Sequence, residues 1–217
     1  MRILIVGLGS VGRRHLRNLA TLGQQDVVLL RSGKATLPES ELEGLAAVHD
    51  LEAALQARPS AAVIATPTSL HLDAAIPLAR AGCHLLLEKP VSHSMDGVDE
   101  LRQAAGEGGA RVMIAFQYRY HPGLRAVERW LHSGASGRPY HARAHYGDYL
   151  PGWHPWEDYR ASYSARADQG GGVVMTLCHP LDYLLWLMGE VQAVTASVGG
   201  RGDLGFSGGG AAGAVLG

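Results

Sequence analysis

Three glycines near the amino terminus of the chain have the spacing of an anion-binding turn. Gly7, Gly9 and Gly12 follow a short apolar run and precede residues with helical spacing. In such a strand–turn–helix context the first glycine permits a tight turn, the second lets the backbone approach a pyrophosphate, and the third lets helix and strand pack closely. Backbone amides at the helix start, including those of Ser10 and Val11, face the phosphates. The pattern predicts a dinucleotide site; a turn that serves only the geometry of the chain is the alternative.

The residues about 20 positions beyond the glycines bear on the kind of dinucleotide, since an acidic residue there binds the ribose 2′-hydroxyl of NAD. This chain has Arg31, Ser32 and Lys34 instead, with no carboxylate at the end of the predicted strand 27–30. Cations suit a 2′-phosphate. We therefore expect NADP(H) to be favoured, with NAD(H) as the other candidate. The alternative is that Arg31 and Lys34 are solvated loop charges.

Two side chains have the chemistry to exchange a proton with a substrate hydroxyl. His179 lies in an apolar segment, 173–188, and an unperturbed imidazole titrates near neutral pH. Lys89 follows a predicted buried strand and can stabilise developing alkoxide charge. Asp182, one helical turn after His179, can orient the imidazole or bind a hydroxyl group. By spacing alone, a hydrogen-bonded core histidine and a solvated lysine at a strand end are the simpler interpretations.

The elements that must position these residues alternate between strand and helix in the first half of the chain. Strands are predicted over 3–6, 27–30, 61–65, 84–87 and 112–116, and helices over 11–22, 51–56, 70–81 and 98–105. The strands are continuous apolar runs, as expected when helices cover both faces of a sheet. Residues 1–119 are therefore predicted to form an α/β domain, a Rossmann-type doubly wound parallel sheet.

The pattern changes in residues 120–217. Helices are predicted over 124–132 and 173–188, and strands over 140–149 and 191–198; the first of these strands alternates apolar and polar residues. From 199 to 217 the chain is rich in glycine and alanine without a clear period, which predicts an irregular tail. We expect a second α/β domain with an open, largely antiparallel sheet, and we expect it to be incomplete, because a stable sheet needs about three or more strands.

Composition excludes several functional classes. The 217 residues are 47% hydrophobic with a formal net charge of −1, which gives no reason to expect nucleic acid or an anionic membrane as partner. No apolar run reaches the ~18 residues of a membrane span, and the amino terminus does not read as a signal peptide. Cys83 and Cys178 are far apart, which predicts reduced thiols in a cytoplasmic protein. No metal site is predicted, because His141 and His145 have no carboxylate or thiol at fitting spacing.

Five motifs together resemble one protein family. They are GLGSVG (7–12), ATPTSLH (65–71), LLLEKP (85–90), FQYRYHP (116–122) and GGGVVMTLCHPLDYLLWLMG (170–189). The chain resembles the glucose–fructose oxidoreductase, inositol dehydrogenase and MocA (Gfo/Idh/MocA) family from residue 1 to about 198. The resemblance implies an NAD(P)-dependent oxidoreductase that acts on sugar- or cyclitol-like alcohols or ketones. It also implies a homo-oligomer that packs through the second-domain sheet.

The resemblance also assigns roles to individual residues. Lys89 matches a lysine near the nicotinamide and the substrate hydroxyl, and His179 matches a general acid/base. Further matches are Thr66, Pro67 and His71 in a loop that passes the cofactor, Glu88 in the cofactor loop, and Gln117, Arg119 and Asp182 on the substrate side. For Glu88, pairing with a cation or with backbone amides is the structural interpretation.

One departure from the family pattern affects the mechanism. Many members carry an aspartate three or four residues before the motif histidine, where this chain has Thr176 and Met175. Neither side chain accepts a proton at neutral pH. Two alternatives therefore stand beside the dehydrogenase: a family member that binds cofactor but is catalytically defective, and a glycosidase that uses NAD transiently.

Overall fold

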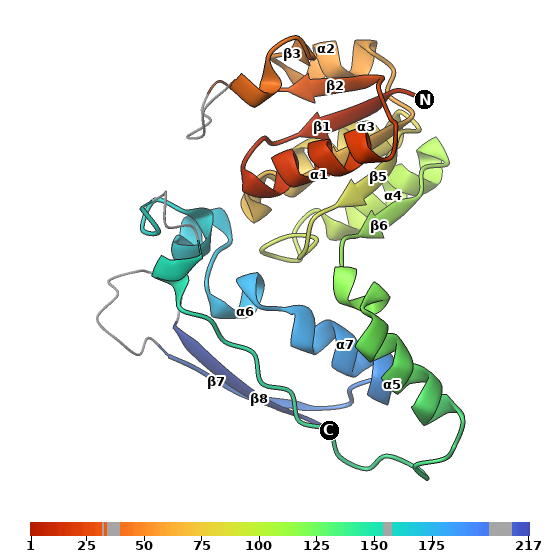
Figure 1. The fold of residues 1–217 in the computed structure, drawn as a ribbon, viewed down its shortest axis with the longest axis vertical. Helices are drawn as coiled ribbons and strands as arrows, with labels where there is room; N and C mark the ends of the chain where they lie inside the picture. The colour runs from red at the N-terminus through yellow and green to blue at the C-terminus, as the bar shows by residue number, and fades with distance from the viewer. Residues whose placement is uncertain (32, 34–39, 154–157, 200–209) are drawn as a thin grey trace. The chain divides into compact units, whose positions relative to one another are not determined.

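A computed structural model describes residues 1–31, 33, 40–153, 158–199 and 210–217 (Figure 1). The chain forms two compact units, Met1–Ala115 and Phe116–Gly217. The sequence predicts the change of domain after residue 119, four residues later. No helix among the described residues is long and apolar enough to cross a membrane.

The first unit contains a six-stranded parallel sheet with the order β3-β2-β1-β4-β5-β6. Its strands are β1 (Ile3–Val6), β2 (Val27–Leu30), β3 (Ala46–Val48), β4 (Ala61–Ile64), β5 (His84–Leu87) and β6 (Val112–Ile114). The chain builds outward from β1 to β3 and then returns to add β4 on the other side of β1. The strand order therefore reverses between β1 and β4, where doubly wound sheets bind their ligands. This confirms the predicted fold class.

Helices cover both faces of this sheet. They are α1 (Ser10–Thr21), α2 (Leu51–Gln56), α3 (His71–Arg80) and α4 (Val98–Gly108). Leu4 and Val6 of β1 belong to a core cluster that includes residues of α2, α3 and α4. Ile3 and Ile5 belong to a second cluster with Leu16 of α1. Because alternate residues of one strand enter different cores, both faces are apolar and the strand reads as an unbroken apolar run.

The second unit is smaller in regular structure. It contains a 3-10 turn, η3 (Gln117–Tyr120), the helices α5 (Pro122–His132), α6 (Val173–Thr176) and α7 (His179–Met188), and the strands β7 (Val194–Gly199) and β8 (Ala211–Leu216). The two strands pair antiparallel, with Val194 opposite Leu216 and Gly199 opposite Ala211. The unit thus has the predicted α/β character with an antiparallel sheet.

Three predictions for the second unit are wrong. Residues 140–149 form no strand, because their alternating side chains face no hydrogen-bonded neighbouring strand in the described part of the chain. The 199–217 tail is not irregular throughout, since pairing with β7 makes a strand of 211–216 despite its alanines and glycine. The predicted helix 173–188 is broken into α6 and α7, because Pro180 has no N–H for a continuous helix and instead occupies the first turn of α7.

Candidate functional site

The glycine turn after β1 packs against the end of β4. Gly7 has φ +90°, and a Cβ built there would lie 2.6 Å from the carbonyl carbon of Ala65 and from the amide nitrogen of Thr66. A Cβ on Gly12 would lie 1.9 Å from the carbonyl oxygen of Gly7. The first and third glycines are thus required by the fold itself, the former by the tight turn and the latter by the approach of α1 to the loop.

The second glycine has no such internal reason. Gly9 is exposed, and a Cβ there would meet nothing within 4 Å among the described residues. It is the N-cap of α1 without a capping side chain, and no acidic residue occupies the first helical turn, which begins with Ser10 and Val11. The start of α1 therefore presents backbone amides and a positive dipole end over an open surface, an arrangement suited to a phosphate.

Thr66 and Pro67 lie in the next loop, after β4. The Thr66 hydroxyl oxygen is buried and has no hydrogen-bond partner among the described residues. Pro67 is half-buried. A buried hydroxyl without a partner beside an open glycine turn fits a bound polar group that supplies the hydrogen bond, because buried polar groups are normally satisfied. The residues present therefore fit a dinucleotide.

His71 connects this loop to the loop after β5. The side chain is 1% exposed, and its Nδ1 and Nε2 lie 3.0 Å from the carbonyl oxygens of Pro90 and Thr66, respectively. Burial lowers the pKa of His71, although the hydrogen bonds to the two carbonyl oxygens oppose this effect. A neutral imidazole has one N–H, so it donates to one of these carbonyl oxygens while its other ring nitrogen lies against the second. Because both ring nitrogens face the backbone, the ring packs between the two loops, and its nitrogens are not presented to a ligand.

The loop after β5 contains Glu88 and Lys89, and the peptide bond between Lys89 and Pro90 is cis. A Glu88 oxygen lies 2.8 Å from Nε2 of His15 on α1, and the other accepts the backbone N–H of Lys89 at 3.3 Å. Burial would raise the pKa of Glu88, but the hydrogen bonds and charges of His15 and Lys89 outweigh it and hold the pKa below its ordinary value. The Glu88 carboxylate thus links this loop to α1.

The end of β2 is only partly described. The Arg31 N–H donates to the carbonyl oxygen of Val48, which extends the pairing of β2 with β3 by one residue. Ser32 and Lys34, which the sequence assigns to the cofactor, lie outside the described residues. Sequence reasoning missed His15 and the buried Arg13, both on α1. Their only signal in the sequence is the RRH run (13–15) directly after the third glycine, and it does not reveal their partners.

In the second unit, His179 is the first residue of α7 and is 5% exposed. Its Nε2 lies 3.4 Å from Nε2 of Gln117, and the Tyr118 ring packs edge-on with its centroid 4.6 Å away. Tyr118 also contacts Tyr146, and their hydrogen bond with burial raises the pKa of Tyr146 to about 12. The imidazole is therefore held by one amide contact and by the edge-on tyrosine ring.

Asp182 is bound by Arg119. The guanidinium donates three hydrogen bonds of 2.7 to 3.1 Å to the two carboxylate oxygens, and Asp182 is 8% exposed. Arg119 also lies 5.9 Å from the Trp186 ring centroid. The two predicted substrate residues are thus engaged with each other and fasten η3 to α7. The preceding helix α6 carries Met175 and a buried Thr176, so no carboxylate lies there.

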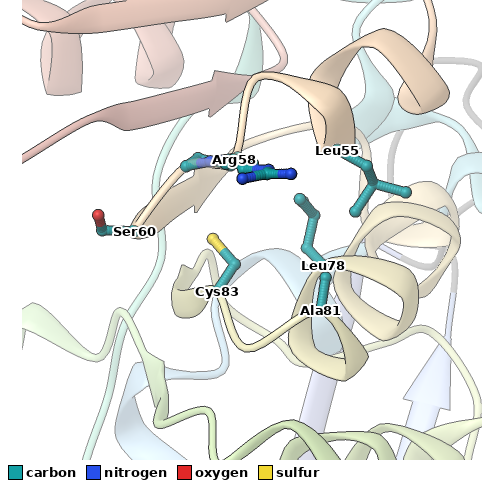
Figure 2. A pocket seen from close by; sticks show the side chains of 7 residues that line it. Leu55, Arg58, Ser60, Leu78, Ala81 and Cys83 are labelled. Carbon is teal, nitrogen blue, oxygen red and sulfur yellow. The ribbon is translucent and has the colours of Figure 1, made fainter.

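A separate hollow of about 390 Å³ lies at the opposite edge of the parallel sheet (Figure 2). It is lined by the ends of α2 and α3 and the starts of β4 and β5, with Arg58, Leu78 and Cys83 among its residues. Burial raises the pKa of the Cys83 thiol to about 11, so the sulfur remains protonated and weakly reactive at neutral pH. This hollow is remote from the glycine turn, and ligands of such sheets bind at the carboxyl ends of the strands. No cluster of three metal-ligating side chains occurs in the described ranges.

Comparison with known families agrees with this geometry. Residues 1–116 match the model of the Gfo/Idh/MocA oxidoreductase family with an NAD-binding Rossmann fold. The chain belongs to the Gfo/Idh/MocA family. Residues 124–209 match the C-terminal domain model of the same family.

Relatives of this chain in the Gfo/Idh/MocA family include two dehydrogenases. Levoglucosan dehydrogenase of Pseudarthrobacter phenanthrenivorans is 31% identical over 135 residues, which are 61% of this chain and 34% of that protein. Inositol 2-dehydrogenase 2 of Saccharopolyspora erythraea is 29% identical over 209 residues, which are 91% of this chain and 56% of that protein. The chain thus spans between a third and just over half of these relatives.

Solved structures share the fold. The WlbA dehydrogenase of Bordetella pertussis, in complex with NADH and UDP-GlcNAcA, superposes with a TM-score of 0.80 at 24% identity over 99% of this chain and 66% of that one. The scyllo-inositol dehydrogenase of Lactobacillus casei, with NAD(H) and scyllo-inositol bound, superposes with a TM-score of 0.75 at 24% identity over 93% of this chain and 60% of that one.

Proposed function

We propose that this chain belongs to an enzyme that transfers a hydride between NADP(H) and a sugar- or cyclitol-like alcohol or ketone. The main observation that supports this proposal is the edge formed by the carboxyl ends of β1, β4 and β5, which are neighbours in the sheet. The loops at this edge contain the glycine turn, the Thr66 hydroxyl, which has no hydrogen-bond partner in the part of the chain that the structure describes, and Lys89. A bound nicotinamide cofactor accepts or donates the hydride.

In this proposal the diphosphate of the cofactor is held by backbone amides rather than by charged side chains. The amides of Gly9, Ser10, Val11 and Gly12 bind the diphosphate at the start of α1, and Thr66 donates or accepts the hydrogen bond that its hydroxyl lacks. Pro67 lies against the cofactor, and Glu88 and His71 keep the loops in place through His15 and two carbonyl oxygens. Arg31, Ser32 and Lys34 favour the 2′-phosphate of NADP(H) over the hydroxyl of NAD(H).

The acid/base pair is Lys89 and His179. Lys89 stabilises negative charge on the reacting oxygen, and His179 takes or returns the proton. Because Arg119 already binds Asp182, we assign both to holding His179 on α7 and to the substrate side of the second unit. Gln117 and Tyr118 fix the imidazole. Cys83 and Cys178 form no disulfide among the described residues, which supports the proposed cytoplasmic location. The exposed strands β7 and β8 support the proposed homo-oligomer.

Replacement of Lys89 tests the role of the pair. Lys89→Met should lower turnover at least about 100-fold, the usual contribution of a proton-transfer or charge-stabilising group, while the cofactor dissociation constant stays within about threefold. Cofactor reduction is followed with a panel of sugars, nucleotide sugars and inositols, and cofactor binding is measured separately. Arg102→Met, which removes an exposed cation from α4, is the matched control. Turnover unchanged in Lys89→Met would overturn the assignment.

A second function is favoured by Met175 and Thr176. Without a carboxylate near His179 on α6, the protein would bind cofactor without turning over substrate. Saturable NADPH binding, together with no cofactor reduction across the whole panel, would support this cofactor-binding role. Restoring the acid by Met175→Asp should then give measurable turnover.

A further inference from the structure

Arg13, the residue after the third glycine, is a buried cation beneath the glycine turn. It is 4% exposed, and its Nε donates to the carbonyl oxygen of Leu8 at 3.0 Å. The side chain thus folds back from α1 onto the loop between β1 and the helix. Its neighbour Arg14 is exposed.

A buried cation in this place needs a nearby anion. The amino-terminal end of a helix carries partial positive charge, so a guanidinium in the first turns of α1 is opposed by the helix dipole as well as by burial. Glu41, in a 3-10 turn after β2 (Ser40–Leu42), contacts it with Oε2 3.6 Å from Arg13 Nη1. The other Glu41 oxygen lies 2.7 Å from Nη1 of the exposed Arg17. One carboxylate is therefore shared by two cations.

The position of the Arg13 guanidinium places it on the side of the sheet where the adenosine ribose of a dinucleotide binds. Arg13 contacts the loop after β1 through Leu8 and the segment after β2 through Glu41. β1 and β2 are adjacent strands, and in doubly wound folds the adenosine ribose is recognised near the end of the second strand. The diphosphate is bound by the amides at the start of the helix, whereas the Arg13 guanidinium is drawn toward the β2 side by Glu41.

We propose that Arg13 binds the 2′-phosphate of NADP(H) and that Glu41 is an internal anion which competes for it. This inference rests on the proposed function and deepens it, because it names a specificity-determining pair beyond Arg31, Ser32 and Lys34. When the phosphate binds, Arg13 exchanges a shared carboxylate at 3.6 Å for a dianionic ligand, and Glu41 keeps its contact with Arg17. NADH has no 2′-phosphate and gains nothing from Arg13.

The test compares the dissociation constants of NADPH and NADH, and of adenosine 2′,5′-bisphosphate and ADP as probes of the adenosine half. Arg13→Gln should raise the dissociation constants of NADPH and the bisphosphate at least tenfold. It should change those of NADH and ADP by less than threefold. Arg13→Lys, which keeps the charge, should retain most of the preference. Glu41→Gln should strengthen the binding of NADPH severalfold and leave the binding of NADH unchanged. Arg14→Gln removes an exposed neighbouring charge and is the control, with both constants unchanged.

Each outcome decides the inference. Equal weakening of NADPH and NADH by Arg13→Gln would mean that Arg13 only supports the Leu8 loop, and would overturn it. If Arg13→Gln does not fold, Glu41→Gln is the deciding variant. An unchanged ratio of its NADPH and NADH dissociation constants would mean that Glu41 does not compete with the phosphate for Arg13, and would overturn the inference. A wild-type protein that binds neither dinucleotide contradicts the proposed function itself. Binding of both with a ratio insensitive to all variants contradicts this inference alone.

Discussion

Gly9 and Gly12 differ in what a methyl group at each position would meet, so two small substitutions separate folding from binding. Gly12→Ala forces a Cβ to within 1.9 Å of the Gly7 carbonyl oxygen, whereas Gly9→Ala meets nothing within 4 Å. We expect Gly12→Ala to cost about 1–3 kcal/mol in the free energy of unfolding. Gly9→Ala should fold nearly as stably as the wild type and bind NADPH at least tenfold more weakly, because the methyl group keeps the diphosphate from the amides. Thermal unfolding and cofactor titration measure the two effects.

The control for both variants is Gly106→Ala, in the exposed part of α4, where a Cβ also meets nothing within 4 Å. It should be neutral or stabilise the helix by up to about 1 kcal/mol. Full cofactor affinity in Gly9→Ala would contradict a diphosphate at the glycine turn.

His71 makes the stability of the protein depend on pH. Its pKa in the folded state is lowered, mainly by burial, so the unfolded chain binds the proton more readily. The stabilising contribution of neutral His71 is therefore complete above about pH 6.5, and it is lost as the pH falls from there through the folded pKa. The free energy of unfolding should decrease by at most about 1.4 kcal/mol per pH unit in this window. His71→Gln should flatten that slope, as measured by denaturant unfolding from pH 7.5 to 5.

Exposed His93 provides the matched control for this experiment, and His93→Gln should keep the wild-type slope. A His71→Gln variant with the same pH slope as the wild type would show that burial of His71 does not cause the pH dependence of stability.

At this scale the sequence indicated which residue types gather at the site, but not their partners. The glycine spacing led to Gly7 and Gly12, whose close packing the structure explains, and the LLLEKP motif predicts a role for Lys89. That His71 bridges two carbonyl oxygens, or that Glu88 accepts from His15 73 positions away, depends on the packing of strands distant in sequence. Local patterns carry no information on such contacts.

At the scale of elements, η3 and α7 are fastened by the Arg119–Asp182 pair. Asp182 is 8% exposed, and Arg119→Met would leave this carboxylate buried without its guanidinium. Since the arginine is itself half-exposed, we expect a loss of about 1–3 kcal/mol rather than the larger cost of a fully buried pair. Arg166→Met, which breaks the exposed pair with Asp168, should cost distinctly less, because both partners of this pair are open to solvent.

Circular dichroism and denaturant unfolding of both variants measure this difference. Equal stability of Arg119→Met and Arg166→Met would mean that the pair does not hold α7. The control lies in the same unit and also removes one arginine from an ion pair, so the comparison isolates burial of the carboxylate.

Secondary structure was predictable where an element is defined by its own periodicity. Strands buried on both faces, such as β1 and β2, appear in the sequence as apolar runs, and both were predicted with the bounds that the structure gives. β3 has three residues and is half to fully exposed, so it leaves no pattern. β8 is built of alanine, glycine and a few larger residues and owes its strand to pairing with β7, while 140–149 has the pattern without the partner.

At the scale of the whole molecule, the buried apolar residues in the described part of the chain are unevenly distributed between the two units. Both core clusters consist of residues from the first unit. In the second unit, every residue of β7 is exposed and α5 buries none of its side chains. Since burial of apolar surface is the main favourable term in folding, the first unit should hold most of the stability of the chain.

Hydrogen exchange should reveal this difference as two levels of protection. Amides of β1 and β4, in the middle of the parallel sheet, should exchange only when the first unit unfolds as a whole, because apolar clusters cover both faces. Amides of β7 and β8 should exchange at least 100-fold faster, since an isolated two-stranded ribbon is marginally stable in water. Mass spectrometry of peptides covering 3–6, 61–64, 194–199 and 211–216 measures both. Protection of β7 and β8 equal to that of β1, at a low protein concentration that disfavours association, would show that the ribbon is stabilised within the single chain and would contradict this division of stability.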